Sequence, residues 1–316
     1  MEIAFDVPAT LENFQEAGYL AANPDVAAAV RSRSIGAREH FESHGRKEGR
    51  RIYRTDWIAK AQAEKIKALE PHLKLEMPHI RRGAKYDFLT DHLREQTGIV
   101  GTHAVSSNHY DENVRKLIDE NPNGLLLDCG SGRRSVYYTN VINYEIVDYE
   151  STDILGVGEA LPFKDDAFDA VISVAVLEHV RDPFVCAAEI VRVLKPGGKL
   201  LCCVPFLQPY HGYPHHYYNM TGQGLRALFE RRMEIDDLRV VESVLPIWSL
   251  TWIVQSWANG LNGRTREEFL SMPLRELLSM PADLLNRSWV KELPTEKNFE
   301  LASATMLFAH KPQPLR

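Results

Sequence analysis

The sequence predicts an α/β fold in which a parallel sheet occupies residues 121–316 and a helical region precedes it. Short apolar runs rich in branched residues are typical of buried parallel strands, and four such runs occur at 124–129, 144–149, 168–174 and 199–206. A helix pattern lies between the last two runs, as a βαβ unit requires. A glycine-rich turn with Gly130 and Gly132 follows the first run directly.

The chain before the sheet is expected to be helical. Residues 1–55 are predicted to be a small helical module, because Asn23 before Pro24 is typical of a helix start and Gly45 suits a helix end. Its basic tail, residues 46–54, fits either a phosphate or glycan contact or a solvated face, and the solvated face is favoured. Residues 56–120 are predicted to form a helical linker or cap, in which Asp111 begins the last helix.

Within residues 121–316, Asp182 and Pro183 begin the helix that precedes Lys195. Little room remains for helices at 131–143 and 149–152, so the first helices of the sheet are expected to be abbreviated. A final strand is predicted at 302–310, paired antiparallel with 234–243. A helical insert is predicted at about 244–301. Its tryptophan-rich part has no lysine or arginine, so we expect it to pack on the sheet or a partner, or to form a lid, rather than lie on a membrane surface.

Composition excludes several classes of function. The net charge of -6 and the pI near 6.1 do not favour a nucleic-acid partner. The N-terminus lacks the basic start and apolar run of a secretory signal, and no run reaches the roughly 18 apolar residues of a spanning helix. Four cysteines without CxxC spacing are expected to be reduced thiols, so the expected location is the cytoplasm.

The residues at the predicted strand ends suggest a cofactor. Ligands of open parallel sheets bind beyond the carboxyl ends of the strands, where Asp128 and the two glycines lie. Asp148 is expected to end the next strand, where a carboxylate can accept hydrogen bonds from ribose hydroxyls. A dinucleotide fingerprint would need a third glycine where Ser135 stands. The D-x-G-x-G order instead suits an adenosine-type cofactor with an ammonium-bearing end near Asp128.

A longer pattern carries a family resemblance. Residues 159–206 contain LPF, FDAV, LEHV, DP, RVLKPGG and VPF in series, and this series resembles class I S-adenosylmethionine-dependent methyltransferases of the type 11 group. The resemblance implies a Rossmann-like sheet and S-adenosylmethionine as the cofactor. It implies that Asp128 and the glycine loop hold the methionine end and that Asp148 holds the ribose. The remaining implied cofactor contacts are Val157, Gly158, Glu159, Ala160, Val176 and Glu178.

Two departures from the family pattern concern the cofactor. Arg134 stands at the third glycine of the usual loop, where it would face outward or pair with an anionic group of the cofactor or substrate. Val157 stands where an acid usually meets adenine, which leaves Glu159 or backbone groups for that contact.

Methyl transfer to oxygen needs a base, because a sugar hydroxyl is a poor nucleophile. The segment 205–221 follows the last parallel strand and contains several histidines and tyrosines. His211 and His215 are the candidate bases in it, and His179 is the rival base. Structural packing of the loop is the alternative. No metal site is predicted, because no acidic residue accompanies these histidines locally.

The N-terminal pattern YLAANPDV…HF…HG resembles a module appended to bacterial surface-polysaccharide enzymes. The predicted function is therefore O-methylation of a sugar or glycan precursor, so the partner is a small-molecule or glycan acceptor. The alternative is a binding or scaffold protein on a methyltransferase fold in the same pathway. A homodimer, or docking to glycan-assembly proteins through the N-terminal module, is the expected mode of association.

Overall fold

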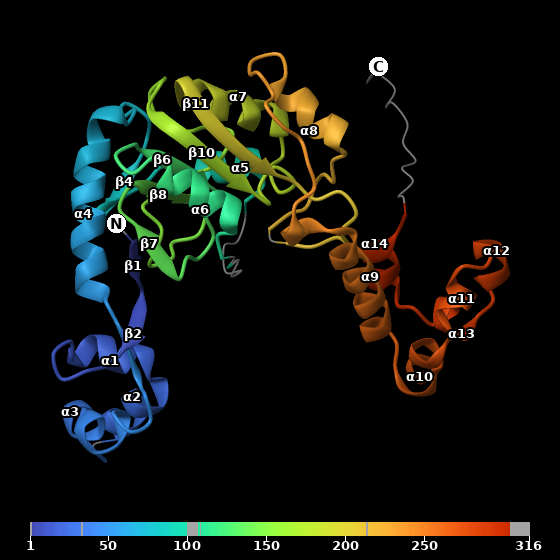
Figure 1. Cartoon of the computed structure of the whole chain (residues 1–316), viewed down its shortest axis with the longest axis horizontal. Coiled ribbons are helices and arrows are strands. Elements are labelled where there is room, and N and C mark those ends of the chain that lie inside the picture. Colours follow the sequence, from blue (N-terminus) through green and yellow to red (C-terminus); the bar gives the residue numbers. More distant parts are fainter. Residues whose placement is uncertain (1, 33, 100–106, 108, 213, 304–316) are drawn as a thin grey trace, which may run out of the picture.

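The structure is a computed structural model that describes residues 2–32, 34–99, 107, 109–212 and 214–303. A seven-stranded sheet lies at its centre in the order β11-β10-β6-β8-β9-β5-β4 (Figure 1). All neighbouring strands are parallel except β4 and β5. The strands of this sheet are β4 Ile80–Arg82, β5 Lys85–Asp87, β6 Leu126–Cys129, β8 Val141–Glu145, β9 Ile154–Leu155, β10 Phe168–Val174 and β11 Leu194–Cys203. The other strands are β1 Glu2–Ala4, β2 Asp6–Pro8, β3 Arg51–Tyr53 and β7 Val136–Tyr138.

The helices fall into three groups along the chain. Those before the sheet are α1 Glu16–Ala22, α2 Pro24–Arg31, α3 Ala37–His40, η1 Phe41–Gly45, α4 Thr55–Leu69, η2 Glu70–His72 and α5 Asp91–Thr97. Those that accompany the sheet are α6 Glu112–Asp119, α7 Pro183–Val193 and α8 Gly222–Phe229. Those of the C-terminal part are η3 Glu242–Val244, α9 Pro246–Gly260, α10 Gly263–Ser271, α11 Leu274–Leu277, α12 Pro281–Leu284, α13 Ser288–Lys291 and α14 Thr295–Leu301.

Alternating side chains of the strands bury the two faces of the sheet. Leu127 of β6 packs in one buried cluster with residues of α7 and α8, whereas its neighbour Leu126 packs on the opposite face with Val114 and Leu117 of α6. Since successive side chains point to opposite faces of a strand, this arrangement requires nearly continuous apolar strands. The predicted run at 168–174 coincides with β10, whereas the predicted run at 144–149 overlaps β8 only in the last two residues of that strand.

Several predicted elements are confirmed. β10 spans the predicted run, α6 begins at Asp111, whose side chain accepts a hydrogen bond from Val114 N, and α7 begins at Asp182, which accepts from Phe184 N and Val185 N. Residues 234–243 are all described and form no strand, so their predicted antiparallel pairing is wrong. The final strand was predicted at 302–310, and residues 304–310 of this range are outside the described residues.

The connection between β6 and β8 contains no helix, which agrees with the expected abbreviation. β7 takes its place and pairs antiparallel with β1 from the N-terminus. α4, from upstream of the sheet, packs beside the same connection, and its Ile66 and Leu69 belong to the main buried cluster. The helices missing from the sheet unit are therefore replaced by segments from the first part of the chain.

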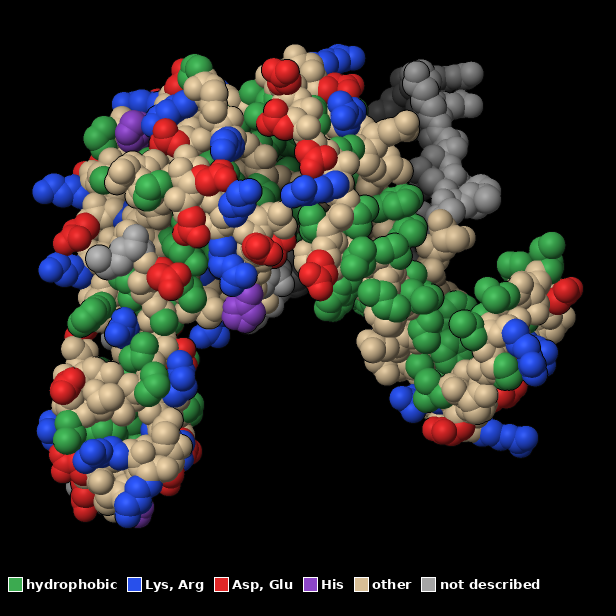
Figure 2. Space-filling view, viewed as in Figure 1, with side chains coloured by type: hydrophobic (Ala, Val, Ile, Leu, Met, Phe, Trp, Pro, Cys, Tyr) green, Lys and Arg blue, Asp and Glu red, His purple; other side chains and the backbone are tan. Residues whose placement is uncertain are grey.

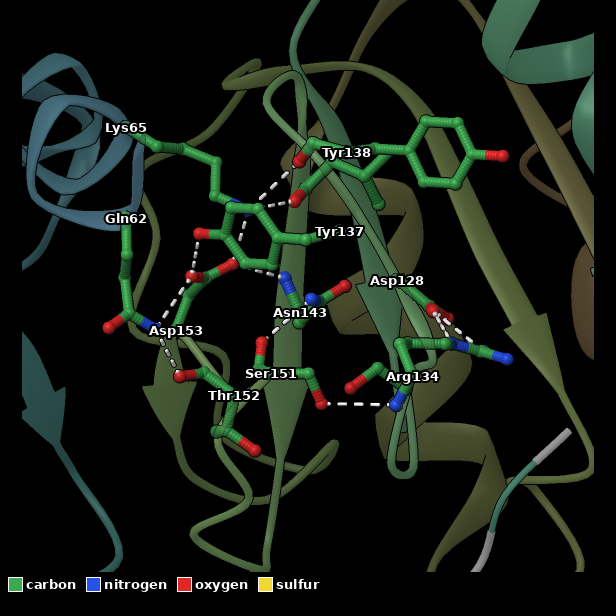
Figure 3. Close-up of polar contacts among 12 residues, drawn as sticks. Gln62, Lys65, Asp128, Arg134, Tyr137, Tyr138, Asn143, Ser151, Thr152 and Asp153 are labelled. Atoms are coloured by element: carbon green, nitrogen blue, oxygen red, sulfur yellow. Dashed lines mark hydrogen bonds and ion pairs between the residues drawn. The ribbon is translucent and has the colours of Figure 1, made fainter. Parts of the chain in front are cut away.

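A buried polar network attaches α4 to the sheet (Figure 3). Lys65 Nζ lies 2.6 Å from Asp153 Oδ2 and 3.7 Å from the centre of the Tyr137 ring, and both charged side chains are almost fully buried. Asp153 also accepts hydrogen bonds from Tyr137 Oη, from Gln62 Nε2 and from the backbone N–H of Asn143. Burial lowers the pKa of Lys65 although the charge of Asp153 opposes this shift. Lys65 and Asp153 thus each have several polar partners, as a buried ion pair requires.

The N-terminal helices form a small unit below the sheet in Figure 1. Tyr19, Val26, Phe41 and Ile52 make up most of its buried cluster. Asn23 stands at the N-cap of α2, but its side chain donates instead to the backbone oxygens of residues 19 and 51. The predicted division at residues 55 and 120 remains a prediction, and β1 ties the start of the chain to the sheet.

The C-terminal helices extend away from the sheet on the opposite side of the molecule (Figure 1). Trp257 of α9 packs among Phe269 and Trp289 of α10 and α13. The first half of α9 remains exposed, with Ile247 and Trp248 each more than half accessible, and Figure 2 shows an apolar surface there.

None of the helices in the described part of the chain has the combination of length and apolar composition that crossing a membrane demands.

Candidate active site

A broad open cleft lies beyond the carboxyl ends of the parallel strands and continues along β11 as far as residues 195–198. Seven residues of the predicted site line it, namely Gly130, Val157, Gly158, Glu159, Val176, His179 and His211. Six others do not, namely Asp128, Gly132, Asp148, Ala160, Glu178 and His215. Ser131, Arg134, Tyr144 and Glu145 also line it, and α9 contributes Trp248, Trp252 and Ile253. The α/β fold thus brings together residues that are far apart in the sequence, as the edge of an open parallel sheet does.

The backbone of the glycine turn has positive φ at both glycines. Gly130 and Gly132 have φ of 81° and 62°, values that glycine adopts without the penalty of a Cβ. A Cβ on Gly130 would lie 2.9 Å from Val176 Cγ1 and closer still to Cγ2. The absence of a side chain therefore lets the turn pack directly against the loop that follows β10.

Asp128 is fully buried at the end of β6, and two side chains hold one of its oxygens. Its Oδ2 accepts from Arg134 Nη2 at 2.7 Å and from Tyr110 Oη at 2.5 Å, while the guanidinium lies 4.0 Å from the centre of the Tyr110 ring. Arg134 thus does not face outward. It forms an internal ion pair with Asp128 (Figure 3). Asp128 Oδ1 is buried without a hydrogen-bond partner.

The carboxylate at the end of the second strand is Glu145, and the predicted placement of Asp148 is wrong. β8 ends at Glu145 because the chain then turns: Tyr149 N–H donates to Val147 O at 2.9 Å, and Thr152 Oγ1 donates to the same oxygen. Asp148 lies within this turn, with its side chain 44% exposed, and pairs with Lys85 at 2.6 Å. It is not among the residues that line the cleft.

Glu145 has the position that the sequence interpretation gave to Asp148. Its Oε2 accepts from the backbone N–H of Gly132 at 2.7 Å and its Oε1 accepts from Ile146 N–H. Burial raises the pKa of Glu145, although these backbone donors oppose the shift. An acidic residue within the apolar run at 144–149 was the available signal, since buried carboxylates are rare without a purpose, but this run contains both Glu145 and Asp148.

The predicted adenine-side segment lies along the cleft wall. Val157 is buried, and its carbonyl accepts from Tyr144 Oη at 2.9 Å. Glu159 Oε1 accepts from Arg181 N–H at 2.9 Å, so this carboxylate fixes the entry to α7. Gly158 lines the cleft, whereas Ala160 packs with a buried cluster and does not line it.

The segment after β11 overhangs the cleft, as expected. The N–H of Tyr217 donates to Glu178 O at 2.7 Å, which attaches the segment to the turn after β10. His211 lines the cleft, and its ring lies 5.1 Å from Trp252 of α9 between centroids. His215 is not brought into the cleft, because its Nε2 donates to Gly98 O and only its backbone oxygen reaches His179.

Glu178 and His179 differ in their surroundings. Glu178 is fully buried, neither carboxylate oxygen has a hydrogen-bond partner, and burial raises its pKa to about 8. His179 lies beside it, with Nε2 3.6 Å from Glu178 Oε1. Burial lowers the pKa of His179 to about 4 and also lowers the pKa of His211. Both rings are therefore neutral near pH 7.

Comparisons with known proteins show what part of the chain around this cleft is similar to. Residues 127–202 match a model described as a methyltransferase domain. The curated relatives include a demethylmenaquinone methyltransferase of Streptomyces avermitilis, which is 32% identical over 28% of this chain and 46% of its own length. They also include the uncharacterized protein YafE of Escherichia coli, which is 30% identical over 32% of this chain and 54% of its own length.

The matched residues run from β6 through β11 and enclose the glycine turn, Glu145 and Glu178. Residues 127–202 are thus similar to a methyltransferase domain, and this similarity supports S-adenosylmethionine as the cofactor. The chain spans about half the length of these curated relatives, so the match concerns this domain rather than whole proteins.

Solved structures related to the methyltransferase domain are more distant. A methyltransferase of Methanosarcina mazei is 21% identical, with a TM-score of 0.35, and the similarity covers 43% of this chain and 90% of that one. A phosphoethanolamine N-methyltransferase of Haemonchus contortus, solved with S-adenosylhomocysteine, is 17% identical, with a TM-score of 0.33, and covers 64% of this chain and 52% of that one.

The residues of the methyltransferase domain fit the cofactor. Asp128 Oδ1 is a buried acceptor without a donor, and the ammonium group of the cofactor could supply that donor. Gly130 presents bare backbone to the cleft, and Glu145 places a carboxylate at the end of the neighbouring strand. Arg134, which already pairs with Asp128, leaves this second oxygen unused.

Proposed function

We propose that the protein transfers the methyl group of S-adenosylmethionine to an oxygen of a glycan precursor. The observation that carries the proposal is the match of residues 127–202 to a methyltransferase domain, together with the fit of Asp128, Gly130 and Glu145 to the cofactor. The bound cofactor supplies a sulfonium methyl group that is reactive without further activation. Placing the acceptor correctly then provides most of the rate enhancement.

The chain's own groups have separable tasks in this proposal. Asp128 Oδ1 would accept from the ammonium end, and Glu145 would accept from the ribose hydroxyls. Val157, Gly158 and Glu159 would flank the adenine, as the family resemblance implies. His211 would act on the acceptor side, because it lines the cleft next to Trp252 and is neutral near pH 7.

A lipid-linked glycan suits the cleft better than a free sugar. Its wall on α9 is apolar, and Trp252 and Ile253 line it beside His211, whose ring can meet the polar part of an acceptor. Aromatic side chains bind sugar rings and acyl chains by apolar contact. The location in the cytoplasm, the polysaccharide pathway, and dimerisation or docking through the N-terminal module remain predictions.

Cofactor binding is the first test. Adding S-adenosylhomocysteine at roughly 100 times its dissociation constant should raise the free energy of unfolding by about 2.7 kcal/mol, because the ligand binds only the folded chain. Thermal unfolding followed by circular dichroism would measure this shift. ATP at the same concentration is the control, since it has the adenosine part without the amino acid. The absence of a shift would favour the alternative of a scaffold protein without catalysis.

The acceptor can be identified with a labelled donor. Methyl-labelled S-adenosylmethionine would be incubated with nucleotide sugars, lipid-linked glycans and demethylated quinones, and label in the glycans is expected. Label in the quinones alone would replace the proposal with the C-methyltransferase activity named for a relative from Shewanella halifaxensis, which is 42% identical over 20% of this chain and 24% of its own length.

Replacing His211 by alanine should lower kcat by about 10²–10⁴-fold, the usual contribution of a group that assists proton transfer. S-adenosylhomocysteine should stabilise this variant as much as the natural protein, because no predicted cofactor contact is changed. His44→Ala, an exposed histidine in the N-terminal helices, is the control for losing an imidazole. Unchanged turnover in His211→Ala would remove His211 from the acceptor site.

A further inference from the structure

We propose that Glu178, His179 and His211 together bind a divalent first-row transition-metal ion on the acceptor side of the cleft. One ligand atom from each of these residues lies within 4.8 Å of the others. The nearest measured pair is His179 Nε2 and Glu178 Oε1 at 3.6 Å. Ligands bound about 2.0–2.2 Å from a metal ion lie roughly 3 Å apart, so small side-chain movements would close the site.

Glu178 provides the main reason to expect a cation. Its side chain is fully buried, and both carboxylate oxygens lack a hydrogen-bond partner. A buried polar group without a hydrogen-bond partner is costly and rare. The neighbouring imidazoles do not compensate, since the closest nitrogen is beyond hydrogen-bond distance. A metal ion between Glu178 and the two rings would satisfy this carboxylate.

The hydrogen bonds of the two rings leave the correct nitrogens for a metal. His179 Nδ1 lies 2.7 Å from His215 O, and His211 Nδ1 lies 2.8 Å from Pro209 O. A carbonyl oxygen can only accept, so each Nδ1 carries the hydrogen and each Nε2 keeps its lone pair. Metal-binding histidines are commonly oriented by such carbonyl contacts.

The adjacent histidine does not share this property. His216 Nδ1 accepts from the backbone N–H of His211 at 3.0 Å, and its Nε2 donates to Asn219 Oδ1 at 2.8 Å. Both nitrogens are therefore engaged. His216 supports the ring of His211 from a centroid distance of 4.3 Å without offering a ligand atom.

The backbone of the loop is adapted to bring the ligands together. Gly212, directly after His211, has φ of 87°, and a Cβ there would lie 2.9 Å from His179 Nδ1. Glycine at this position lets the loop cross closely over His179. The sequence could not indicate the site, because its acid comes from the turn after β10 and one histidine from the loop after β11.

The donor set indicates which ions would bind. Two imidazole nitrogens and one carboxylate oxygen suit Zn²⁺, Fe²⁺, Co²⁺ or Mn²⁺, and three protein ligands leave coordination positions open. The role of the ion rests on the proposed function. With the ion bound, His211 would assist as a ligand rather than as the proton acceptor, because its only lone pair would be on the metal. The acceptor hydroxyl would lose its proton to water, the C–S bond of the donor would break as the O–C bond forms, and the sulfur would keep the electron pair as a neutral thioether.

The test uses the full chain without a polyhistidine tag, after removal of metal with a chelator. Calorimetric titration with Zn²⁺ should show saturable binding of a single ion per chain, and Co²⁺ should give visible absorption bands typical of mixed nitrogen and oxygen ligands. Glu178→Gln, His179→Ala and His211→Ala should each weaken Zn²⁺ binding by about 100-fold or more, beyond the range known for residues that only support ligands.

His92→Ala is the control, since this exposed histidine of α5 lies outside the cluster, and its Zn²⁺ affinity should equal that of the natural protein. Circular dichroism shows whether each variant folds, and the Co²⁺ spectrum of the natural protein tests the site without any substitution. Absence of saturable binding, or equal Zn²⁺ affinity in the natural protein and Glu178→Gln, would overturn the proposal. The titrations need no cofactor, so failure of the metal site and failure of S-adenosylhomocysteine binding are separate results.

Discussion

Replacing Lys65 by alanine should lower the free energy of unfolding by about 3–5 kcal/mol, because it leaves Asp153 buried without its counter-charge. Asp153 would keep its hydrogen bonds from Tyr137, Gln62 and Asn143, but no cation would remain beside it among the described contacts. Urea unfolding followed by circular dichroism at neutral pH measures the change. This is a large part of the 5–15 kcal/mol that usually separates folded from unfolded domains.

Lys67→Ala is the matched control, because Lys67 is an exposed lysine on the same helix. Both variants replace lysine by alanine, so they change the helix propensity of α4 by the same amount. Its effect should be within about 0.5 kcal/mol of zero. Lys65→Ala/Asp153→Asn removes both charges and should recover part of the loss, since the uncompensated charge is then absent. Equal stability of Lys65→Ala and Lys67→Ala would mean that the network does not hold α4 to the sheet.

The importance of Lys65 follows from the missing helices. A parallel sheet normally receives helices from its own crossovers, which cover both faces. The connection between β6 and β8 has none, so β7 and β8 depend on α4 and β1 for cover. Lys65 Nζ also approaches the carbonyl oxygens of Tyr138 and Val141, which places one side chain of α4 over the whole abbreviated connection.

The sequence predicted best those elements whose local patterns agree with the final packing. The run at 168–174 is a central strand, and α7 carries its own start in Asp182 and Pro183. The run at 144–149 misled by several residues, because Ile146 and Val147 are apolar but belong to a turn closed by Thr152. Apolar content alone cannot locate a strand end when a threonine hydroxyl supplies the hydrogen bond that ends it.

Long-range polar contacts were beyond the sequence reasoning. Arg134 was considered as a contact to an anion or as an exposed residue, yet it pairs with Asp128 beneath the ring of Tyr110. Glu178 was expected to contact the cofactor, but its carboxylate lies with two histidines. Composition and spacing identify charged residues, whereas their partners depend on which segments the fold brings together.

Substituting Gly130 by alanine should abolish most of the stabilisation by S-adenosylhomocysteine and lower the free energy of unfolding by about 2–5 kcal/mol. The left-handed φ of 81° alone costs about 1–2 kcal/mol with a Cβ, and overpacking against Val176 adds about 1–3 kcal/mol. The turn or the loop after β10 must then move, and both line the cleft. Thermal unfolding with and without S-adenosylhomocysteine measures both effects.

Gly197→Ala separates crowding from backbone strain. Gly197 has nearly the same φ, 78°, but a Cβ there would meet nothing within 4 Å. It lies in the first half of β11, where it lines the extension of the cleft along that strand rather than the turn after β6. This variant should lose only about 1–2 kcal/mol and keep its full response to S-adenosylhomocysteine. If Gly130→Ala and Gly197→Ala respond equally to the ligand, the glycine turn does not contact the cofactor, and the binding mode proposed for Asp128 and Glu145 would lose its anchor.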